Sequence, residues 1–392
     1  MNKEIRQYVA TTFSGLEAVL AEELEQLGAI ETEIGLRAVT FKGDKELLYK
    51  ANLWCRTALR ILAPVKTFSS KDEHELYSEV QKIDWSEFMS VTDTLSIDAG
   101  VSTSTINHSK YAALKTKDAI VDQFRTKFDA RPSVDVAHPT IRINVRIAHD
   151  QCSLSLDSSG EILYKRGYRD TVNIAPLNEV LAAGMILLSG WDKKSNFVDF
   201  MCGSGTLLSE AGLIAKNIPP GIFRSEFGFE KWKDFDSELW EKVLDEAAGK
   251  KIAKLDFKIV GSDIESRAIR VAKGNIENAG LSKVVELNVV PFQEMMPPTG
   301  GGIAIINPPY GERITPEDIN TMYKEIGDVL KHKFSGYDAW VLTSNMEAAK
   351  NIGLRPSRKI SLFNAALECK YLKFSIYDGT KKIHKLEKKE EE

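Results

Sequence analysis

The chain lacks the features that mark secreted, membrane-spanning and metal-stabilised proteins. No apolar run in its 392 residues reaches the roughly 20 residues that a membrane-spanning helix needs. The N-terminal stretch MNKEIRQYVATTFSG has no apolar secretion signal. The four cysteines form no C-x-x-C pair, and the histidines show no metal-ligand spacing. The composition therefore predicts a water-soluble cytoplasmic protein with reduced thiols and no metal.

An overall excess of positive charge is also missing. The net charge of -4 argues against a uniformly basic nucleic-acid binder. Residues 101–131 are an exception, with six Lys or Arg against three Asp. A helix with Lys110, Lys115 and Lys117 beside Tyr111 fits contacts to phosphates, although a solvated helix face explains the same charges.

Length and pattern predict two or three domains, at roughly one domain per 150 residues. The pattern predicts three blocks and a tail: an α+β block at residues 1–62, a second α+β block at 63–158, a βα-alternating domain at 159–378 and a charged tail at 379–392. We expect the last helix of the first block to cover residues 45–61, and the second block to open with a helix over 70–89.

The third block predicts an α/β fold with a mostly parallel sheet. Five apolar strands are each followed by helix-like sequence, and ligands bind at the carboxyl ends of such strands. The strands are NFVDFM, DFKIVGSDI, KVVELNVV, GGIAIIN and DAWVLTS.

A glycine turn follows the first of these strands. The strand ends at Asp199, and Gly203 and Gly205 precede a helix that starts near Thr206. Glycines let the backbone approach a ligand, but a tight βα connection has the same pattern. Asp263 ends the next strand, where its carboxylate suits either a ribose diol or a helix N-cap.

This turn, C-G-S-G-T, lacks the third glycine of a dinucleotide fingerprint and resembles class I S-adenosylmethionine-dependent methyltransferases. The resemblance implies that Asp199 lies beside the methionine part of the cofactor and that Asp263 holds the ribose. For Cys202, packing is favoured over nucleophilic catalysis, because it lies in the cofactor turn. The implied cofactor-binding residues are Asp199, Cys202, Gly203, Gly205, Thr206, Asp263, Ile264, Phe292 and Asn307.

The stretch IINPPYGER places Asn307, Pro308, Pro309 and Tyr310 after the fourth strand. It resembles the N-P-P-Y motif of methyltransferases that modify exocyclic amines, which implies that these four residues are catalytic. The Asn307 side-chain oxygen and the Pro308 carbonyl would hold the amine, and the Tyr310 ring would stack on a flipped base. The motif itself does not choose between adenine N6, guanine N2 and glutamine.

The resemblance extends over residues 3–377. LWCRTALRIL resembles a ferredoxin-like region, and STINHSKYAALKTKDAIVDQF, RPSVD, IRINVRI and LSLDSSGEILYKRGYR resemble an RNA-binding THUMP domain and its junction. APLNEVLAAGMI, MYKEIGDVLK, VLTSN and LFNAALECKYLKF continue the match to bacterial 23S rRNA guanine-N2 methyltransferases, including the N-terminal half of a larger enzyme. The implied RNA contacts are Lys110, Tyr111, Lys115, Lys117, Arg131, Arg166 and Arg169.

Two positions depart from that family. Pro291 stands where relatives commonly have an Asp that contacts adenine, which leaves Phe292 and Glu294 as substitutes, and FM replaces a proline-containing segment after Asp199. The expected function is a 23S rRNA guanine-N2 methyltransferase with S-adenosylmethionine as cofactor and RNA as partner, and without the larger enzyme's second activity. The alternatives are a tRNA guanine-N2 methyltransferase, an adenine-N6 DNA methyltransferase and an inactive RNA-binding assembly factor.

Overall fold

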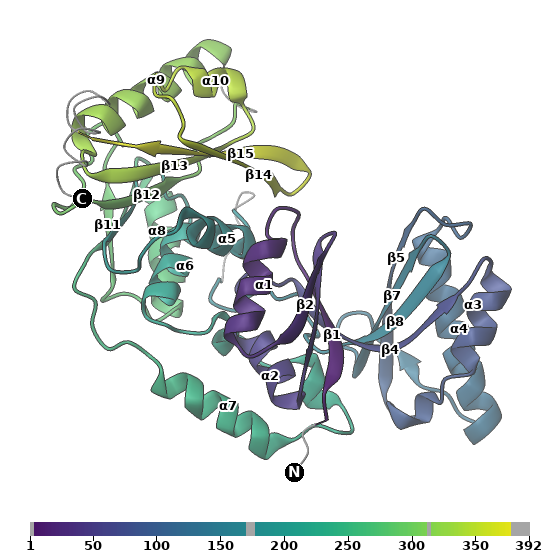
Figure 1. The fold of residues 1–392 in the computed structure, drawn as a ribbon. Helices are drawn as coiled ribbons and strands as arrows, with labels where there is room; N and C mark the ends of the chain where they lie inside the picture. The colour runs from purple at the N-terminus through teal and green to yellow at the C-terminus, as the bar shows by residue number, and fades with distance from the viewer. Residues whose placement is uncertain (1–3, 170–176, 312–314, 378–392) are drawn as a thin grey trace. The chain divides into compact units, whose positions relative to one another are not determined.

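The computed structural model describes residues 4–169, 177–311 and 315–377 (Figure 1). The charged tail expected at 379–392 and the first residues of APLNEVLAAGMI lie outside the described residues. The described chain divides into two compact units. Unit 1 holds residues 4–12, 20–163 and 224–246, and unit 2 holds 13–19, 164–169, 177–223, 247–311 and 315–377.

Unit 1 is built on an eight-stranded sheet in the order β2-β3-β1-β4-β8-β7-β5-β6. Its pairs are antiparallel except that β5 runs parallel to β6 and β7. The strands are β1 (Arg6–Thr11), β2 (Ile30–Gly35), β3 (Ala38–Gly43), β4 (Arg60–Ser69), β5 (Thr94–Ser102), β6 (Ser133–Val134), β7 (Ile141–Ala148) and β8 (Gln151–Asp157). The helices of this stretch are α1 (Glu17–Gln26), α2 (Lys45–Trp54), α3 (Glu73–Gln81), α4 (Ser109–Phe128) and the short 3₁₀ helix η1 (Trp85–Glu87).

The predicted helices before and after β4 are both longer than the observed ones. The helix expected over 45–61 ends at Trp54, because Cys55 adopts an extended conformation, and the helix expected over 70–89 is α3 followed by η1. β4 pairs with β1 through Arg60–Leu62 and with β8 through Leu62–Ser69. The boundary expected between residues 62 and 63 therefore falls inside a strand that joins both halves of one sheet.

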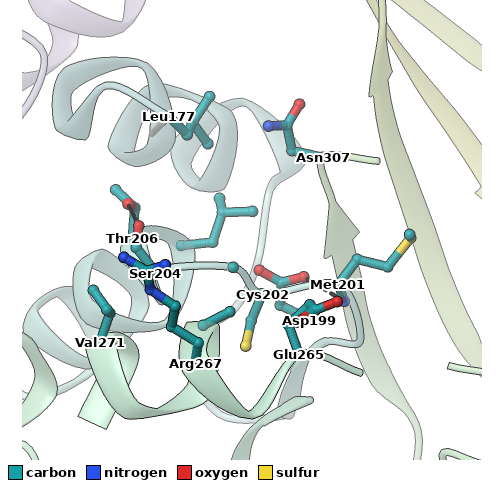
Figure 2. Close-up of a pocket in the computed structure, with 13 residues that line it drawn as sticks. Leu177, Asp199, Met201, Cys202, Ser204, Thr206, Glu265, Arg267, Val271 and Asn307 are labelled. Carbon is teal, nitrogen blue, oxygen red and sulfur yellow. Dashed lines mark hydrogen bonds between the residues drawn. The ribbon is translucent and has the colours of Figure 1, made fainter. Parts of the chain in front are cut away.

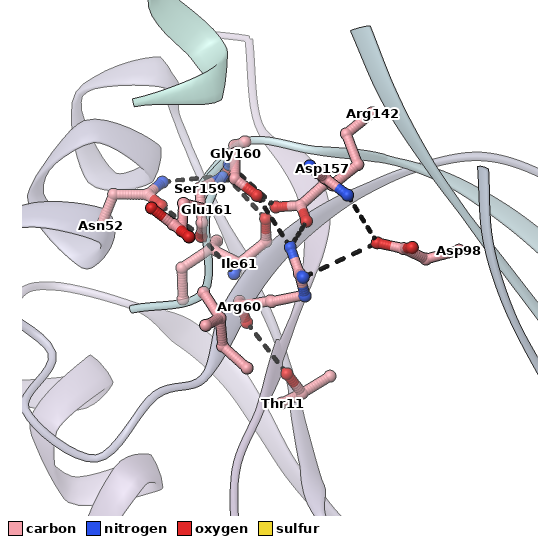
Figure 3. Close-up of polar contacts among 12 residues, drawn as sticks. Thr11, Asn52, Arg60, Ile61, Asp98, Arg142, Asp157, Ser159, Gly160 and Glu161 are labelled. Carbon is pink, nitrogen blue, oxygen red and sulfur yellow. Dashed lines mark hydrogen bonds and ion pairs between the residues drawn. The ribbon is translucent and has the colours of Figure 1, made fainter. Parts of the chain in front are cut away.

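A polar network around one buried carboxylate supports this joint (Figure 3). Arg60 pairs with Asp157, which is 1% exposed, and donates to the Gly160 carbonyl at 2.9 Å. Asp98 accepts from Arg142 at 3.1 Å and lies 3.6 Å from Arg60. A buried carboxylate is tolerated only with such partners, so the network fixes how β4, β5, β7 and β8 meet.

Unit 2 has a seven-stranded sheet in the order β11-β10-β9-β12-β13-β15-β14. β9 to β13 run parallel, as predicted, and β15 pairs antiparallel with β13 and β14. The strands are β9 (Asn196–Asp199), β10 (Ile259–Asp263), β11 (Val285–Val289), β12 (Gly302–Ile306), β13 (Tyr337–Thr343), β14 (Arg358–Asn364) and β15 (Leu367–Ser375). The helices are α5 (Glu179–Ser189), α6 (Thr206–Ala215), α8 (Ser266–Asn278), α9 (Pro316–Lys333), α10 (Met346–Lys350) and the 3₁₀ helix η2 (Pro220–Phe223).

Helices cover both faces of the unit 2 sheet. Figure 1 shows α9 and α10 on one side and α5, α6 and α8 on the other. On the α9 side, Phe200, Ile306 and Val341 pack with Tyr323 and Leu330 in one buried cluster. This is the helix-covered parallel sheet that the regular βα alternation predicts.

The segment Arg224–Glu246 follows η2 in the chain but belongs to unit 1. It contains the 3₁₀ helix η3 (Gly228–Lys231) and most of α7 (Ser237–Gly249). The Tyr49 ring on α2 stacks on Phe229 at 4.3 Å and meets the edge of Trp240 at 5.9 Å. We call this segment the strap, since it completes the unit 1 core from a distant part of the sequence.

Candidate active site

A cavity of about 450 Å³ opens at the carboxyl ends of β9, β10 and β12 (Figure 2). Because β9 lies between β10 and β12, this is the switch point at which open α/β sheets bind ligands. Its volume lies within the ~300–1,000 Å³ typical of small-molecule sites. Its lining residues are Leu177, Asp199, Met201, Cys202, Gly203, Ser204, Thr206, Leu207, Glu265, Arg267, Ala268, Val271 and Asn307.

The glycine turn is shaped by backbone conformation and by a close contact. Gly203 and Gly205 have φ of +51° and +75°, in the left-handed region that favours glycine. A Cβ on Gly205 would also lie 3.0 Å from the Ala272 side chain on α8. The turn therefore passes close to α8, and the start of α6 at Thr206 faces the cavity.

Asp199 is a carboxyl group that is 2% exposed at the floor of the cavity. It accepts a hydrogen bond from the Met201 amide at 3.2 Å. Burial, with the negative charge of Asp263 nearby, raises the pKa of Asp199 to about 8. A cationic ligand would favour its charged form.

Asp263, the last residue of β10, does not line the cavity but connects the end of β10 to the glycine turn that follows β9. Its carboxylate accepts from the Gly203 amide at 2.9 Å and from the Glu265 amide at 3.0 Å. The N-cap of α8 is Glu265, so the N-cap alternative for Asp263 is wrong. Glu265 itself lines the cavity, and an acidic residue two positions after the strand end was the available signal.

Asn307 lines the cavity, and its side chain is hydrogen-bonded to Tyr310. The Tyr310 hydroxyl donates to the Asn307 side-chain oxygen at 2.5 Å. The side-chain amide of Asn345 donates to the Tyr310 carbonyl at 3.2 Å, and that of Asn364 to its hydroxyl at 3.4 Å. Burial raises the pKa of Tyr310, which keeps the phenol protonated as a donor. The Asn307 side-chain oxygen has a second lone pair, which leaves one acceptor position for a substrate amine.

The other predicted cofactor residues differ in whether they line the cavity. Cys202 lines it, and burial raises the pKa of its thiol well above the usual value, so it is not a thiolate nucleophile. Ile264 is 67% exposed. Phe292 is partly buried and stacks on Phe200 at 6.1 Å, and neither it nor Ile264 lines the cavity.

The predicted RNA contacts on unit 1 are accessible. Lys110, Tyr111 and Arg131 are exposed. The Lys115 ammonium lies 5.7 Å from the centre of the Tyr111 ring, and Lys117 pairs with Asp118 at 2.6 Å. The first turns of α4 therefore present positive charge beside an aromatic ring.

Arg166 and Arg169 are a correction, because unit 2 holds them inside. Arg166 is 2% exposed with its Nε 3.5 Å from Glu210, and Tyr168 donates to the same carboxylate at 3.0 Å. The Arg169 side chain is 13% exposed and pairs with Glu179 at 3.2 Å. Neither guanidinium lies on a surface that could bind phosphates. The sequence shows two arginines near a domain junction but not the buried acids that pair with them.

Within the described ranges, no three His, Cys, Asp or Glu side chains converge in a way that could hold a metal ion. The helices described for this chain include none that is long and apolar enough to cross a membrane.

Comparison with known proteins identifies the family. Residues 166–373 match the RMKL-like methyltransferase domain, 7–62 the RlmL ferredoxin-like domain and 70–157 the THUMP domain. A Synechocystis protein described provisionally as an RNA methyltransferase is 41% identical, over 95% of this chain and 97% of its own length.

A ribosomal RNA large subunit methyltransferase K/L of Syntrophotalea carbinolica is 42% identical, over 94% of this chain and 53% of its own length, so this chain spans about half of that relative. A crystal structure of a provisionally assigned methyltransferase complexed with SAH superposes with a TM-score of 0.87 at 32% identity, covering 97% of this chain and 100% of the other. The chain therefore belongs to the family of RMKL-like RNA methyltransferases with ferredoxin-like and THUMP domains.

Proposed function

We propose that this chain transfers a methyl group from S-adenosylmethionine to the exocyclic N2 of a guanine in RNA, with 23S rRNA as the target. The observation that carries the proposal is that Asn307 of the N-P-P-Y turn lines the same cavity as the glycine turn and Asp199. The residues that we propose to hold the cofactor and the residue that we propose to accept the amine therefore line one cavity.

S-adenosylmethionine is the cofactor, in keeping with the SAH complex of the similar structure. It supplies an electrophilic methyl group on a positively charged sulfonium. The cavity residues fit such a group, since Asp199 is a buried carboxyl that a cationic methionine end would ionise. Glu265, which lines the cavity at the start of α8, would supply an acceptor for ribose hydroxyls, whereas Asp263 would act through the Gly203 and Glu265 amides that it holds in place.

The role of Asn307 follows from the weak nucleophilicity of an exocyclic amine, whose lone pair is delocalised into the ring. Two acceptors aimed at the amine hydrogens, the Asn307 side-chain oxygen and the Pro308 carbonyl, would orient the amine toward the methyl group. The Tyr310 hydroxyl, now bonded to Asn307, would turn away as the base enters. Its ring would then be free to stack on the base.

RNA as substrate is supported by the THUMP match and by the basic start of α4. Relatives named as ribosomal RNA large subunit methyltransferases support 23S rRNA, although this chain spans about half of their length. Folded RNA is gripped mainly by shape and phosphates, which leaves the chemistry to one extruded base.

The test is methyl transfer from labelled S-adenosylmethionine to unmodified total RNA, followed by nucleoside analysis. We expect label in N2-methylguanosine of 23S rRNA with the wild type. Asn307→Ala should lower the rate by about 100-fold or more, because it removes a preorganised polar contact to the reacting group. Asn320→Ala, which changes an exposed asparagine on α9, is the matched control and should leave the rate unchanged.

The outcomes separate the alternatives. Label in tRNA would keep the chemistry and reject the rRNA target. Label at adenine N6 would reject guanine N2. No cofactor binding by calorimetry and no label in any RNA would favour an inactive RNA-binding protein.

A further inference from the structure

Arg169 contacts the starts of two helices at the edge of the cavity. One Nη atom donates to the Thr206 hydroxyl at 2.5 Å and lies 3.5 Å from the Leu177 carbonyl oxygen, which it also contacts as a donor. The other Nη pairs with Glu179 at 3.2 Å. Thr206 is the first residue of α6, and Glu179 is the first residue of α5.

Two of these partners, Leu177 and Thr206, line the cavity themselves. Figure 2 shows Leu177 and Thr206 around the same space as the glycine turn. A single guanidinium therefore joins one wall of the cavity to the end of the glycine turn.

The link is largely shielded from solvent. The Arg169 side chain is 13% exposed and that of Glu179 6%. The planar guanidinium reaches several acceptors in fixed directions, whereas a lysine ammonium is a point charge on a flexible stem. Loss of the arginine would also leave the Glu179 carboxylate buried without its cation.

We propose that Arg169 is a positioning residue, which holds the Leu177 segment and Thr206 at the separation that S-adenosylmethionine requires. This inference rests on the proposed function, because it assigns the cavity to that cofactor. This positioning role replaces the RNA contact that the resemblance implies for Arg169. A positioning role predicts that loss of the arginine weakens cofactor binding and not RNA binding, and an RNA contact predicts the reverse.

The test uses the full chain with Arg169→Met, and it measures the S-adenosylmethionine Kd by calorimetry, the KM and kcat of methyl transfer, and RNA affinity against salt. We expect the cofactor Kd and KM to rise by about 10-fold to 100-fold, as for loss of hydrogen bonds from a charged group. RNA affinity and its salt slope should stay unchanged. Weaker RNA binding with an unchanged cofactor Kd would overturn the proposal.

Arg169→Lys separates positioning from charge neutralisation. It keeps a cation for Glu179 but cannot reach all three acceptors, so we expect a cofactor Kd raised several-fold. A Lys variant equal to the wild type would overturn the proposal, and it also serves if Arg169→Met fails to fold. Arg358→Met, at an exposed position of β14, is the matched control. A wild type that does not bind the cofactor would reject the proposed function itself, whereas a wild type and Arg169→Met that bind equally would reject only this inference.

Discussion

Asp199 combines deep burial with a position on the floor of the cavity. Its pKa of about 8 means that the free protein holds a proton there at neutral pH. The cost of ionising it comes mainly from burial, and Asp263 adds repulsion. A ligand with a positive charge would reverse both effects, because the charged carboxylate would then gain a partner. Cofactor binding should therefore be coupled to the release of a proton.

The prediction is that S-adenosylmethionine binds more tightly as the pH rises toward 8, by up to about tenfold per pH unit, and that the gain levels off above that value. The sign follows because the free state holds the extra proton below pH 8 and the complex does not. Calorimetry at pH 7 in two buffers with different ionisation enthalpies should show proton release.

Asp199→Asn should bind the cofactor weakly and with little pH dependence, whereas Asp256→Asn, at an exposed aspartate of unit 2, should behave like the wild type. Proton uptake on binding to the wild type would contradict this coupling.

Helix α4 and strand β4 show which elements the sequence predicts well. The run NHSKYAALKTKDAIVDQFRTKF, residues 107–128, predicts a helix, and the structure confirms it as α4, which begins two residues later at Ser109. Before β4, the helical pattern continues past Trp54 without a Gly or Pro stop signal. Pro64 lies inside β4, and because proline is rare within strands, the sequence does not predict a strand there. The partners of β4 are distant in the chain, and local pattern cannot show them.

The same limit applies to the candidate site. Asp199, Gly203 and Asn307 follow strand ends, and the parallel order of the strands brings them to one edge. The roles of Arg166 and Arg169 depend on acids buried in helices, which spacing along the chain does not reveal.

The basic start of α4 is an element whose charge should be measurable. The double change Lys110→Ala, Lys115→Ala should weaken RNA binding and lower the slope of log K against log salt by up to about 1.4, if each lysine neutralises one phosphate of a single strand. Cofactor affinity should not change, because every cavity residue belongs to unit 2. Lys254→Ala, with a side chain 87% exposed in unit 2, is the control. An unchanged salt slope in the double variant would mean that α4 is only a solvated face.

At the scale of the whole molecule, the chain passes between the two units more than once. Unit 1 takes the strap, Arg224–Glu246, from between two segments of unit 2. The strap contributes Trp240, which is 8% exposed and packs its edge against Phe227 and Phe229 at 5.6 and 5.2 Å. The core of unit 1 is therefore incomplete without sequence that lies within the methyltransferase domain match.

Trp240→Ala tests this arrangement, because the lost aromatic packing should destabilise unit 1 by about 3–5 kcal/mol. RNA affinity should fall as unit 1 loosens, while S-adenosylmethionine binding should persist, since the cavity is built wholly from unit 2. Thermal unfolding followed with and without the cofactor should show an early transition that the cofactor does not shift. Leu36→Ala, at a residue 86% exposed in unit 1, should show no early transition. Loss of cofactor and RNA binding in a single transition would instead mean that the two units unfold as one, so that the strap stabilises the catalytic unit as well as the RNA-binding one.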